Sequence, residues 1–532
     1  MDDSRNGVLI ILIGGNVCLV ADEDKRRQAG INHRPASIEE FKEIILGDRK
    51  AEYLLSREKY IDGINLRVDF FDLRRDVNRS SIDPEELDSS QLDPGLWASI
   101  AQVIYDKYLD YEGFVILHGL DTMAYTASGL SFMLQRLNSP VVLTGSQRPL
   151  NYSRTDAIQN IITAITIAGA ASLGFGFPIP EVMICCFDSL LRGNRSTMIH
   201  ASSYRAFDSP NYSPLATFGE HIDIQNVSKR SLKKTRRLIL RKNFNSMVTI
   251  LDVFPGMDPC VIEQLASTRG LKGVLLRTYG LGTAPTSKEV IDALKKVVDA
   301  NIVVMNVTQA RGGRISYRED PVSLRLLEHG VISGADMTAE AAYAKMVVLL
   351  SESEISRENN VTEREQREIA EDLLQIDQCG EQSQSIFHFH FGSGETLPDK
   401  NGNFSAILET SRPMEERHLV EANLDKIAYI QLSVLGLYPS KESDVRFNRL
   451  IEFEVFIVNK YPDRYEMIKR IRQDVLRWYT SSKKTINVAC DISDSLEYLL
   501  SPDTRLGINT TEPIKWEKMT IAIYLKLPII VK

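Results

Sequence analysis

The feature that most constrains the fold is a short, continuous apolar run that ends at a glycine and leads into a helical pattern. Val8–Ile13, Gly113–His118 and Val141–Thr144 each fit this description. Helical patterns follow the second run, to Leu137, and the third, over Asp156–Ala168. Strands that are apolar on both faces and alternate with helices are typical of a parallel sheet covered on both sides. The sequence therefore predicts an α/β fold, with functional loops at the carboxyl ends of these strands.

A second α/β unit is predicted farther along the chain. Val248–Val253, Gly273–Leu276 and Ile302–Asn306 are further candidate strands, and Lys288–Asp299 and Ala339–Leu350 have helical patterns. We therefore predict a two-domain core with parallel sheets and divide the chain as follows: an N-terminal α/β domain (1–228), a basic connector (229–246), a C-terminal α/β domain (247–350), a linker with one helix around Glu363–Leu374 (351–385) and a further domain (386–532).

The last of these regions is predicted to be a small α+β domain. Ala428–Val434, Leu450–Val458 and Ile521–Leu527 favour strands. Tyr465–Trp478 carries apolar residues at helical spacing and favours an amphipathic helix. Its sequence resembles no family that we recognise.

Charge and cysteine content indicate a compartment and exclude some partners. The 532-residue chain has a net charge of −8 and a pI near 5.7, which argues against attraction to nucleic acid or anionic membranes. The segment 229–242 has eight basic residues and no acidic one, and it is either a solvated connector or a polyanion-binding tract. The first apolar run is far shorter than the ~20 residues of a membrane span. Six cysteines without a C-x-x-C pair indicate reduced, buried thiols. We therefore expect a cytoplasmic protein without a signal peptide.

The common cofactor and metal motifs are absent from the sequence. Gly14-Gly15-Asn16 lacks the third glycine of a dinucleotide loop, and neither a Walker lysine nor an H-E-x-x-H string occurs. His388 and His390 could share one face of a strand, but no third metal ligand lies nearby. We therefore expect no cofactor and no metal.

Six longer strings resemble the type I L-asparaginase family, in both order and spacing. They are HGLDTMAYTAS at 118–128, VLTGSQ at 142–147, LRGNRST at 191–197, AFDSPN at 206–211, NVTQ at 306–309 and GVISGADMT at 330–338. The resemblance covers about residues 7 to 350 and includes the animal and fungal forms. It implies hydrolysis of L-asparagine to L-aspartate and ammonia, a larger N-terminal and a smaller C-terminal domain, and a dimer or tetramer with active sites between neighbouring subunits.

The resemblance also implies that catalytic residues are replaced. The family's nucleophilic threonine matches Asn16, its second threonine matches Leu120 and its lysine matches Met198, whereas its aspartate is retained as Asp121. No tyrosine lies between residues 17 and 46, where the family's mobile loop supplies one. A hydroxyl nucleophile needs a nearby base and a cation that lowers its pKa, and these replacements remove both the nucleophile and its activating group. The residues therefore predict a pseudoenzyme.

Residues that the family uses for binding are better preserved. Asp88, Ser89 and Asp121 match positions that hold the α-amino and α-carboxylate groups of asparagine, although Asp121 could instead cap a helix. Thr197 and Arg277 match a regulatory asparagine pocket, of which Thr283 and Ala310 are departures. Arg277 could equally form an ion pair at the edge of the core.

Three functions remain open from the sequence. The first is a pseudoenzyme that binds a small amino acid such as L-asparagine, a sibling subunit or another protein. The second is a working amidohydrolase with a nucleophile recruited from Thr122, Thr126, Ser89 or Ser90. The third is an interaction platform in which Leu120 and Met198 fill the former pocket.

Overall fold

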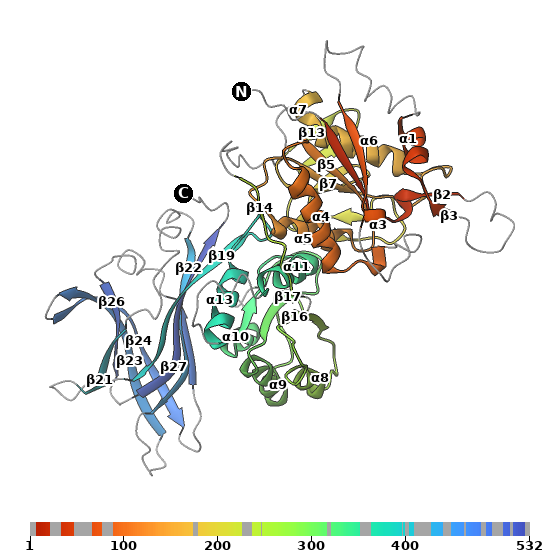
Figure 1. Ribbon diagram of the computed structural model, residues 1–532. Helices are drawn as coiled ribbons and strands as arrows, with labels where there is room; N and C mark the ends of the chain where they lie inside the picture. The colour runs from red at the N-terminus through yellow and green to blue at the C-terminus, as the bar shows by residue number, and fades with distance from the viewer. Residues whose placement is uncertain are drawn as a thin grey trace. The chain divides into compact units, whose positions relative to one another are not determined.

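The computed structural model describes residues 7–21, 33–46, 66–76, 89–173, 179–225, 237–245, 247–315, 321–351, 363–395, 397–398, 404–408, 427–439, 448–461, 464–479, 486–491, 504–510 and 514–526. The chain forms two compact units. The first comprises Met1–Leu374 and Gln378–Gln382, and the second comprises Gln375–Asp377 and Ser383–Lys532. Both are drawn in Figure 1.

The N-terminal lobe of the first unit is built on an eight-stranded sheet with the order β13-β12-β9-β8-β7-β5-β1-β4. The five strands from β8 to β4 are parallel, and the other three join them antiparallel. The strands are β1 (Val8–Leu12), β4 (Val68–Asp72), β5 (Gly113–Leu117), β7 (Val141–Thr144), β8 (Val182–Cys186), β9 (Ser189–Arg192), β12 (Ala216–Phe218) and β13 (Ile222–Ile224). The predicted parallel sheet is confirmed.

Helices cover both faces of this sheet because its strands are apolar on both faces. Leu9 and Ile11 of β1 pack in one buried cluster with α4 (Pro94–Lys107) and α5 (Met123–Met133). The alternate residues Val8, Ile10 and Leu12 pack in a second cluster with α1 (Ile38–Leu46) and α6 (Ala157–Ala168). Successive side chains of a strand point to opposite faces, so one continuous apolar run supplies two cores.

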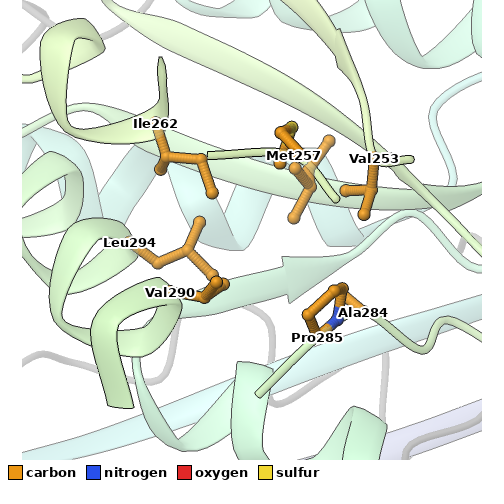
Figure 2. Close-up of a pocket in the computed structure, with 8 residues that line it drawn as sticks. Val253, Met257, Ile262, Ala284, Pro285, Val290 and Leu294 are labelled. Carbon is orange, nitrogen blue, oxygen red and sulfur yellow. The ribbon is translucent and has the colours of Figure 1, made fainter. Parts of the chain in front are cut away.

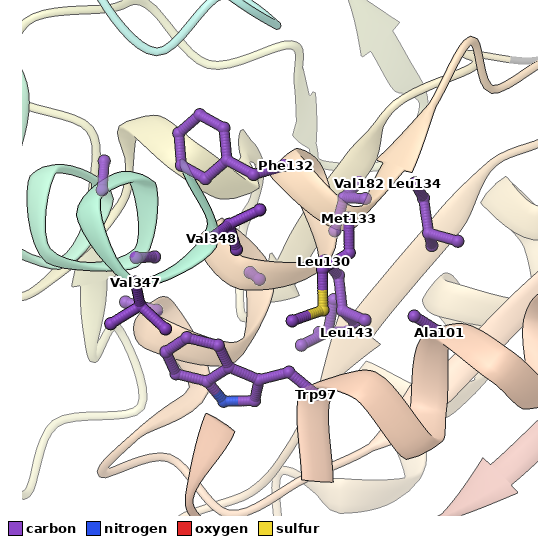
Figure 3. Close-up of a cluster of buried hydrophobic side chains, with 14 of the residues drawn as sticks. Trp97, Ala101, Leu130, Phe132, Met133, Leu134, Leu143, Val182, Val347 and Val348 are labelled. Atoms are coloured by element: carbon purple, nitrogen blue, oxygen red, sulfur yellow. The ribbon is translucent and has the colours of Figure 1, made fainter. Parts of the chain in front are cut away.

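The C-terminal lobe contains a four-stranded parallel sheet with the order β15-β16-β17-β18. Its elements are β15 (Val248–Asp252), α8 (Pro259–Leu265), β16 (Gly273–Thr278), α9 (Lys288–Asp299), β17 (Val303–Thr308), α10 (Pro321–Glu328), β18 (Val331–Ser333) and α11 (Ala339–Leu349). Helix α11 packs on α5 of the other lobe. Figure 3 shows Val347 and Val348 of α11 in the cluster that holds Trp97 and Phe132. The two lobes therefore share one core.

Short elements complete the first unit. They are the 3₁₀ turns η1 (Asn16–Cys18), η4 (Ser89–Gln91) and η5 (Gly193–Arg195), the strands β2 (Leu19–Ala21), β3 (His33–Pro35), β6 (Leu134–Gln135), β10 (Thr197–Met198), β11 (Phe207–Asp208) and β14 (Ile239–Leu240), and the helices α3 (Leu73–Asp76), α7 (Ala170–Leu173) and α13 (Glu363–Gln375). The helix predicted in the linker is confirmed by α13. Residues 229–236 and 246 of the basic connector lie outside the described residues.

The second unit consists of strands in the part of the chain that is described. One antiparallel sheet has the order β19-β27-β22-β25 and another the order β20-β21-β26-β23-β24. The strands are β19 (Gln384–Glu395), β20 (Leu397–Pro398), β21 (Phe404–Leu408), β22 (Ile427–Pro439), β23 (Asn448–Tyr461), β24 (Arg464–Tyr479), β25 (Ile486–Asp491), β26 (Thr504–Thr510) and β27 (Ile514–Lys526). The predicted strands Ala428–Val434 and Leu450–Val458 are confirmed within β22 and β23. The third is confirmed in β27 up to Lys526, and Leu527 lies outside the described residues.

The amphipathic helix predicted over Tyr465–Trp478 is wrong. That segment is strand β24, which pairs with β23 from Tyr461 opposite Arg464 to Asn448 opposite Tyr479. A long antiparallel partner satisfies the backbone of the segment, and such pairing overrides a weak helical preference. The helical part of the expected α+β domain is therefore missing from the described residues between 384 and 526.

The cysteine prediction is correct only in part. Cys18, Cys185, Cys186, Cys260 and Cys379 are free thiols, and the first three are buried. Cys260 is exposed and Cys379 is half-buried, so the expectation that all the thiols are buried is wrong. Among the described residues, no helix has both the length and the apolar character required to cross a membrane.

Candidate functional site

Two glycine turns meet at the carboxyl ends of neighbouring parallel strands. Leu12 at the end of β1 lies opposite Leu117 at the end of β5. The following turns approach so closely that a Cβ on Gly15 would lie 2.3 Å from the Cα of Gly119. Gly15 also has a φ of +78°, which favours glycine. Local backbone geometry therefore brings the positions of Asn16 and Leu120 into one neighbourhood.

Asn16 is exposed and begins the 3₁₀ turn η1. Its Nδ2 donates a hydrogen bond to the backbone oxygen of Gln147, at 3.0 Å. Gln147 is held in turn, because its backbone N–H donates to the carboxylate of Asp156 at 3.1 Å. The Asn16 amide therefore ties the first glycine turn to the loop after β7, and it has no ionisable hydroxyl.

Leu120 is a packing residue in this structure. Its side chain is 8% exposed and belongs to the same buried cluster as α4 and α5. It lies against the backbone of Gly145, since a Cβ there would be 2.9 Å from Leu120 Cδ2. Met198, in β10, pairs with Phe207 and packs half-buried against the same cluster. Both replacements thus contribute apolar contacts.

Asp121 directly precedes the N-cap of α5, and Ser89, in η4, lies against the same turn. Asp121 is exposed, and it makes no hydrogen bond or ion pair with the described residues. It does not cap α5, whose N-cap is Thr122. The Thr122 hydroxyl donates to the backbone oxygen of Ser89 at 2.8 Å, and Ser89 is buried against Gly119. Asp88 lies outside the described residues.

A histidine and a threonine form a hydrogen-bonded pair beneath the site. His118 and Thr126 are fully buried. His118 Nδ1 lies 2.6 Å from the oxygen of Gly119, and a carbonyl only accepts, so Nδ1 carries the proton. Nε2 then accepts from the Thr126 hydroxyl at 2.9 Å. Burial lowers the pKa of His118 to about 4, so the ring is neutral near pH 7.

This pair has the groups of a base and a nucleophile but no access to substrate, since both side chains are fully buried. Sequence analysis named Thr126 and missed His118 as its partner. The available signal was a histidine placed directly after an apolar strand, eight residues before the threonine.

The residues that match the regulatory pocket lie around Glu340, at the start of α11. The Thr197 hydroxyl donates to Glu340 Oε1 at 2.7 Å. Arg277 forms an ion pair with Asp252 at 3.0 Å, as the alternative interpretation expected. Burial raises the pKa of Glu340, although the Thr197 hydrogen bond and the Arg277 charge act in the opposite direction. Burial and the Glu340 charge raise the pKa of Tyr125 to about 12.

The two departures from this pocket lie in the C-terminal lobe. The Thr283 hydroxyl donates to the backbone oxygen of Tyr279 at 3.3 Å, and Ala310 is exposed. Thr197 and Arg277 thus form a hydrogen bond and an ion pair with carboxylates of the chain itself, and Thr283 forms a hydrogen bond with a backbone carbonyl.

A separate cavity lies within the C-terminal lobe. It measures about 10 Å³, which is roughly the room that one water molecule needs. Figure 2 shows part of its apolar lining: Val253, Met257, Ile262, Ala284, Pro285, Val290 and Leu294. Leu276 completes the lining. An apolar cavity of this size is too small to hold a substrate molecule. The described residues include no cluster of three or more histidine, cysteine, aspartate or glutamate side chains that could hold a metal ion.

Comparisons with known proteins identify the family to which the fold belongs. Family models described as "Asparaginase, N-terminal" and "Glutaminase/Asparaginase C-terminal domain" match residues 7–230 and 247–360. The chain is 40% identical over 266 residues to L-asparaginase 1 of Escherichia coli K12, covering 50% of this chain and 76% of that protein.

Two further relatives place this match in context. The chain is 35% identical over 269 residues to the 60 kDa lysophospholipase of Mus musculus, covering 51% of this chain and 46% of that protein. The crystal structure of L-asparaginase I from Vibrio cholerae superposes with a TM-score of 0.57 at 30% identity, covering 71% of this chain and 99% of that one. The solved relative shares the two-lobed fold described above. Together, these matches show that the chain belongs to the type I L-asparaginase family.

Proposed function

We propose that this family member has lost, or greatly reduced, the hydrolysis of L-asparagine and acts by binding a ligand or a partner. The observation that carries the proposal is the environment of Leu120. At the position of the family's second threonine, an apolar side chain is packed into the core. Asn16, at the nucleophile position, uses its side chain to bridge two loops. Neither residue supplies the hydroxyl that an ester intermediate requires.

Three of the four hydroxyl groups considered as replacement nucleophiles are hydrogen-bonded or buried. Thr126 is buried in its bond to His118, and Thr122 is bonded to the Ser89 carbonyl. Ser89 itself is buried, whereas Ser90 is exposed. The competing proposal, an active amidohydrolase with a relocated nucleophile, requires one of these residues to reach the substrate beside a base. His118 is already committed to Thr126, which favours the first proposal.

Asp121 supports binding of an amino acid. An exposed carboxylate without an ion pair to the described residues can accept the α-ammonium group of a ligand. Ser89 lies nearby, and in this proposal Asp88 completes the set. Thr197 and Arg277 would form a second, regulatory pocket. We further propose a cytoplasmic homo-oligomer, as the resemblance implies.

Thermal unfolding with L-asparagine tests the binding role. A ligand at one hundred times its Kd stabilises a folded protein by about 2.7 kcal/mol. We expect L-asparagine to raise the unfolding temperature of the parent and to have little effect on Asp121→Asn. Asp292→Asn is the matched control, since it removes an exposed carboxylate from α9 in the other lobe. If L-asparagine, L-aspartate and L-glutamine all leave the unfolding temperature unchanged, amino-acid binding at this site is refuted and the interaction-platform alternative is favoured.

A further inference from the structure

A short segment after α13 returns to the first unit and is buried there. We call residues Gln378–Gln382 the strap. Within it, Glu381 forms an ion pair with Lys345 of α11, at 2.7 Å between Oε1 and Nζ, and both side chains are 0% exposed. The same carboxylate accepts from the backbone N–H groups of Gln378 and Cys379, at 2.9 and 2.8 Å. Glu381 therefore closes the strap's own turn and joins it to α11.

The strap also contacts the turn η5, which lies in the family string at 191–197. Asn194 Nδ2 donates to the backbone oxygen of Cys379 at 3.3 Å and contacts its Sγ at 3.1 Å. Arg192 Nη1 donates to the backbone oxygen of Gly380 at 3.4 Å. Gly380 has a φ of +90°, and a Cβ there would lie 2.6 Å from Arg192 Nη1. The strap thus fits its receiving surface only with glycine at this position.

The receiving side chains are held rigidly. Arg192 forms two bonds to the Glu181 carboxylate, at 2.6 and 2.9 Å, and its guanidinium stacks on Tyr212. Asn194 is 1% exposed. A buried lysine requires a compensating carboxylate, because an uncompensated charge in the interior is strongly unfavourable. When it is seated, the strap supplies such a carboxylate to Lys345.

Two residues beyond η5 lies β10, which contains Thr197 and Met198. Arg195, at the end of η5, is itself fixed by an ion pair with Asp336 at 3.1 Å. We propose that the strap is a positioning element, which holds η5 and thereby the Thr197–Met198 strand in place. The strap lies beyond residue 360, where the family-model match ends. In this proposal, the part of the chain that holds the candidate site in place extends through Gln382. This is independent of whether the site binds an amino acid.

Full-length Glu381→Gln tests the proposal with two local readouts. The first is the rate of Cys379 labelling by a thiol reagent, resolved by peptide mass spectrometry, with the exposed Cys260 as an internal reference. The second is hydrogen exchange in peptides covering 193–198. Glu263→Gln is the matched control, because it removes a surface Lys–Glu pair of the same chemistry, which joins Glu263 to Lys296.

We expect Glu381→Gln to speed Cys379 labelling at least tenfold and to speed exchange in 193–198, with Cys260 labelling and exchange in β16 and β17 unchanged. Gly380→Ala should give the same pattern, because the added methyl group prevents the strap from seating while the Lys345–Glu381 charges remain. This variant keeps the proposal testable if Glu381→Gln does not fold. Faster Cys379 labelling without faster exchange in 193–198 would overturn the positioning role. Unchanged values for both readouts would show that the strap is not held by these contacts.

Discussion

Replacing Leu120 by alanine should destabilise the first unit, because Leu120 now works as a core residue. The change removes three carbon atoms from a side chain that is 8% exposed and packed beside Gly145. At about 0.8 kcal/mol per buried methylene, the lost transfer free energy is about 2.4 kcal/mol. Cavity formation adds to this, and measured Leu→Ala changes in cores span about 2 to 5 kcal/mol. Leu120 lies at the edge of the cluster, so we expect the lower end, about 2.5 to 3 kcal/mol.

Guanidinium unfolding monitored by tryptophan fluorescence is a suitable assay. The chain has three tryptophans, and replacing Trp478 and Trp516 by phenylalanine leaves Trp97, in the same cluster as Leu120, as the reporter. Leu109→Ala is the matched control, since that side chain is 78% exposed and should change the free energy of unfolding by less than about 0.5 kcal/mol. If Leu120→Ala costs no more than the control, the argument that Leu120 has become a core residue is refuted.

Three further predictions follow from buried or constrained groups. The neutral form of His118 is favoured in the folded state, with a pKa of about 4, so its stabilisation is complete above pH 6.5 and is lost as the pH falls towards 4. The free energy of unfolding should drop by about 3 kcal/mol over that pH window, and the drop should be smaller in His118→Gln. Denaturant titrations at several pH values measure both drops, and equal drops in the two proteins would exclude His118 as the cause. Gly15→Ala should prevent folding or lower the unfolding temperature several times more than Gly256→Ala does. Both glycines have a positive φ, but only a Cβ on Gly15 would clash with other backbone atoms. Similar decreases in the two variants would contradict the steric argument. Asp252→Asn should cost less than about 1 kcal/mol, since its ion pair with Arg277 is partly exposed, and a loss above 2 kcal/mol at 0.1 M salt would show that the pair is structurally essential.

The sequence predicted the parts of the fold in which local pattern and tertiary structure agree. The run Val8–Ile13 is apolar at every position, and a strand buried on both faces requires that pattern. Val141–Thr144 and Lys288–Asp299 were predicted with their observed bounds. The segment 465–478 was misassigned because the register of β24 depends on β23, a partner that periodicity does not reveal.

The candidate site was predictable in its positions and less so in its contacts. Asn16 and Leu120 could be placed because the strings around them align without gaps. The hydrogen bond from Asn16 to Gln147 and the pair of His118 with Thr126 join segments whose approach only the folded structure reveals. The buried partner of Lys345 lies 36 residues farther along the chain, beyond the family's strings, so no motif pointed to Glu381.

Ammonia release from L-asparagine by the purified full-length protein tests the central claim most directly, when it is measured beside the triple variant Asn16→Thr, Leu120→Thr, Met198→Lys. Removing members of a catalytic group that acts as a unit costs several orders of magnitude in rate. We predict no release above background from the parent protein. Parent turnover above background, abolished by changing Thr122, Thr126, Ser89 or Ser90, would contradict the account and establish a relocated nucleophile.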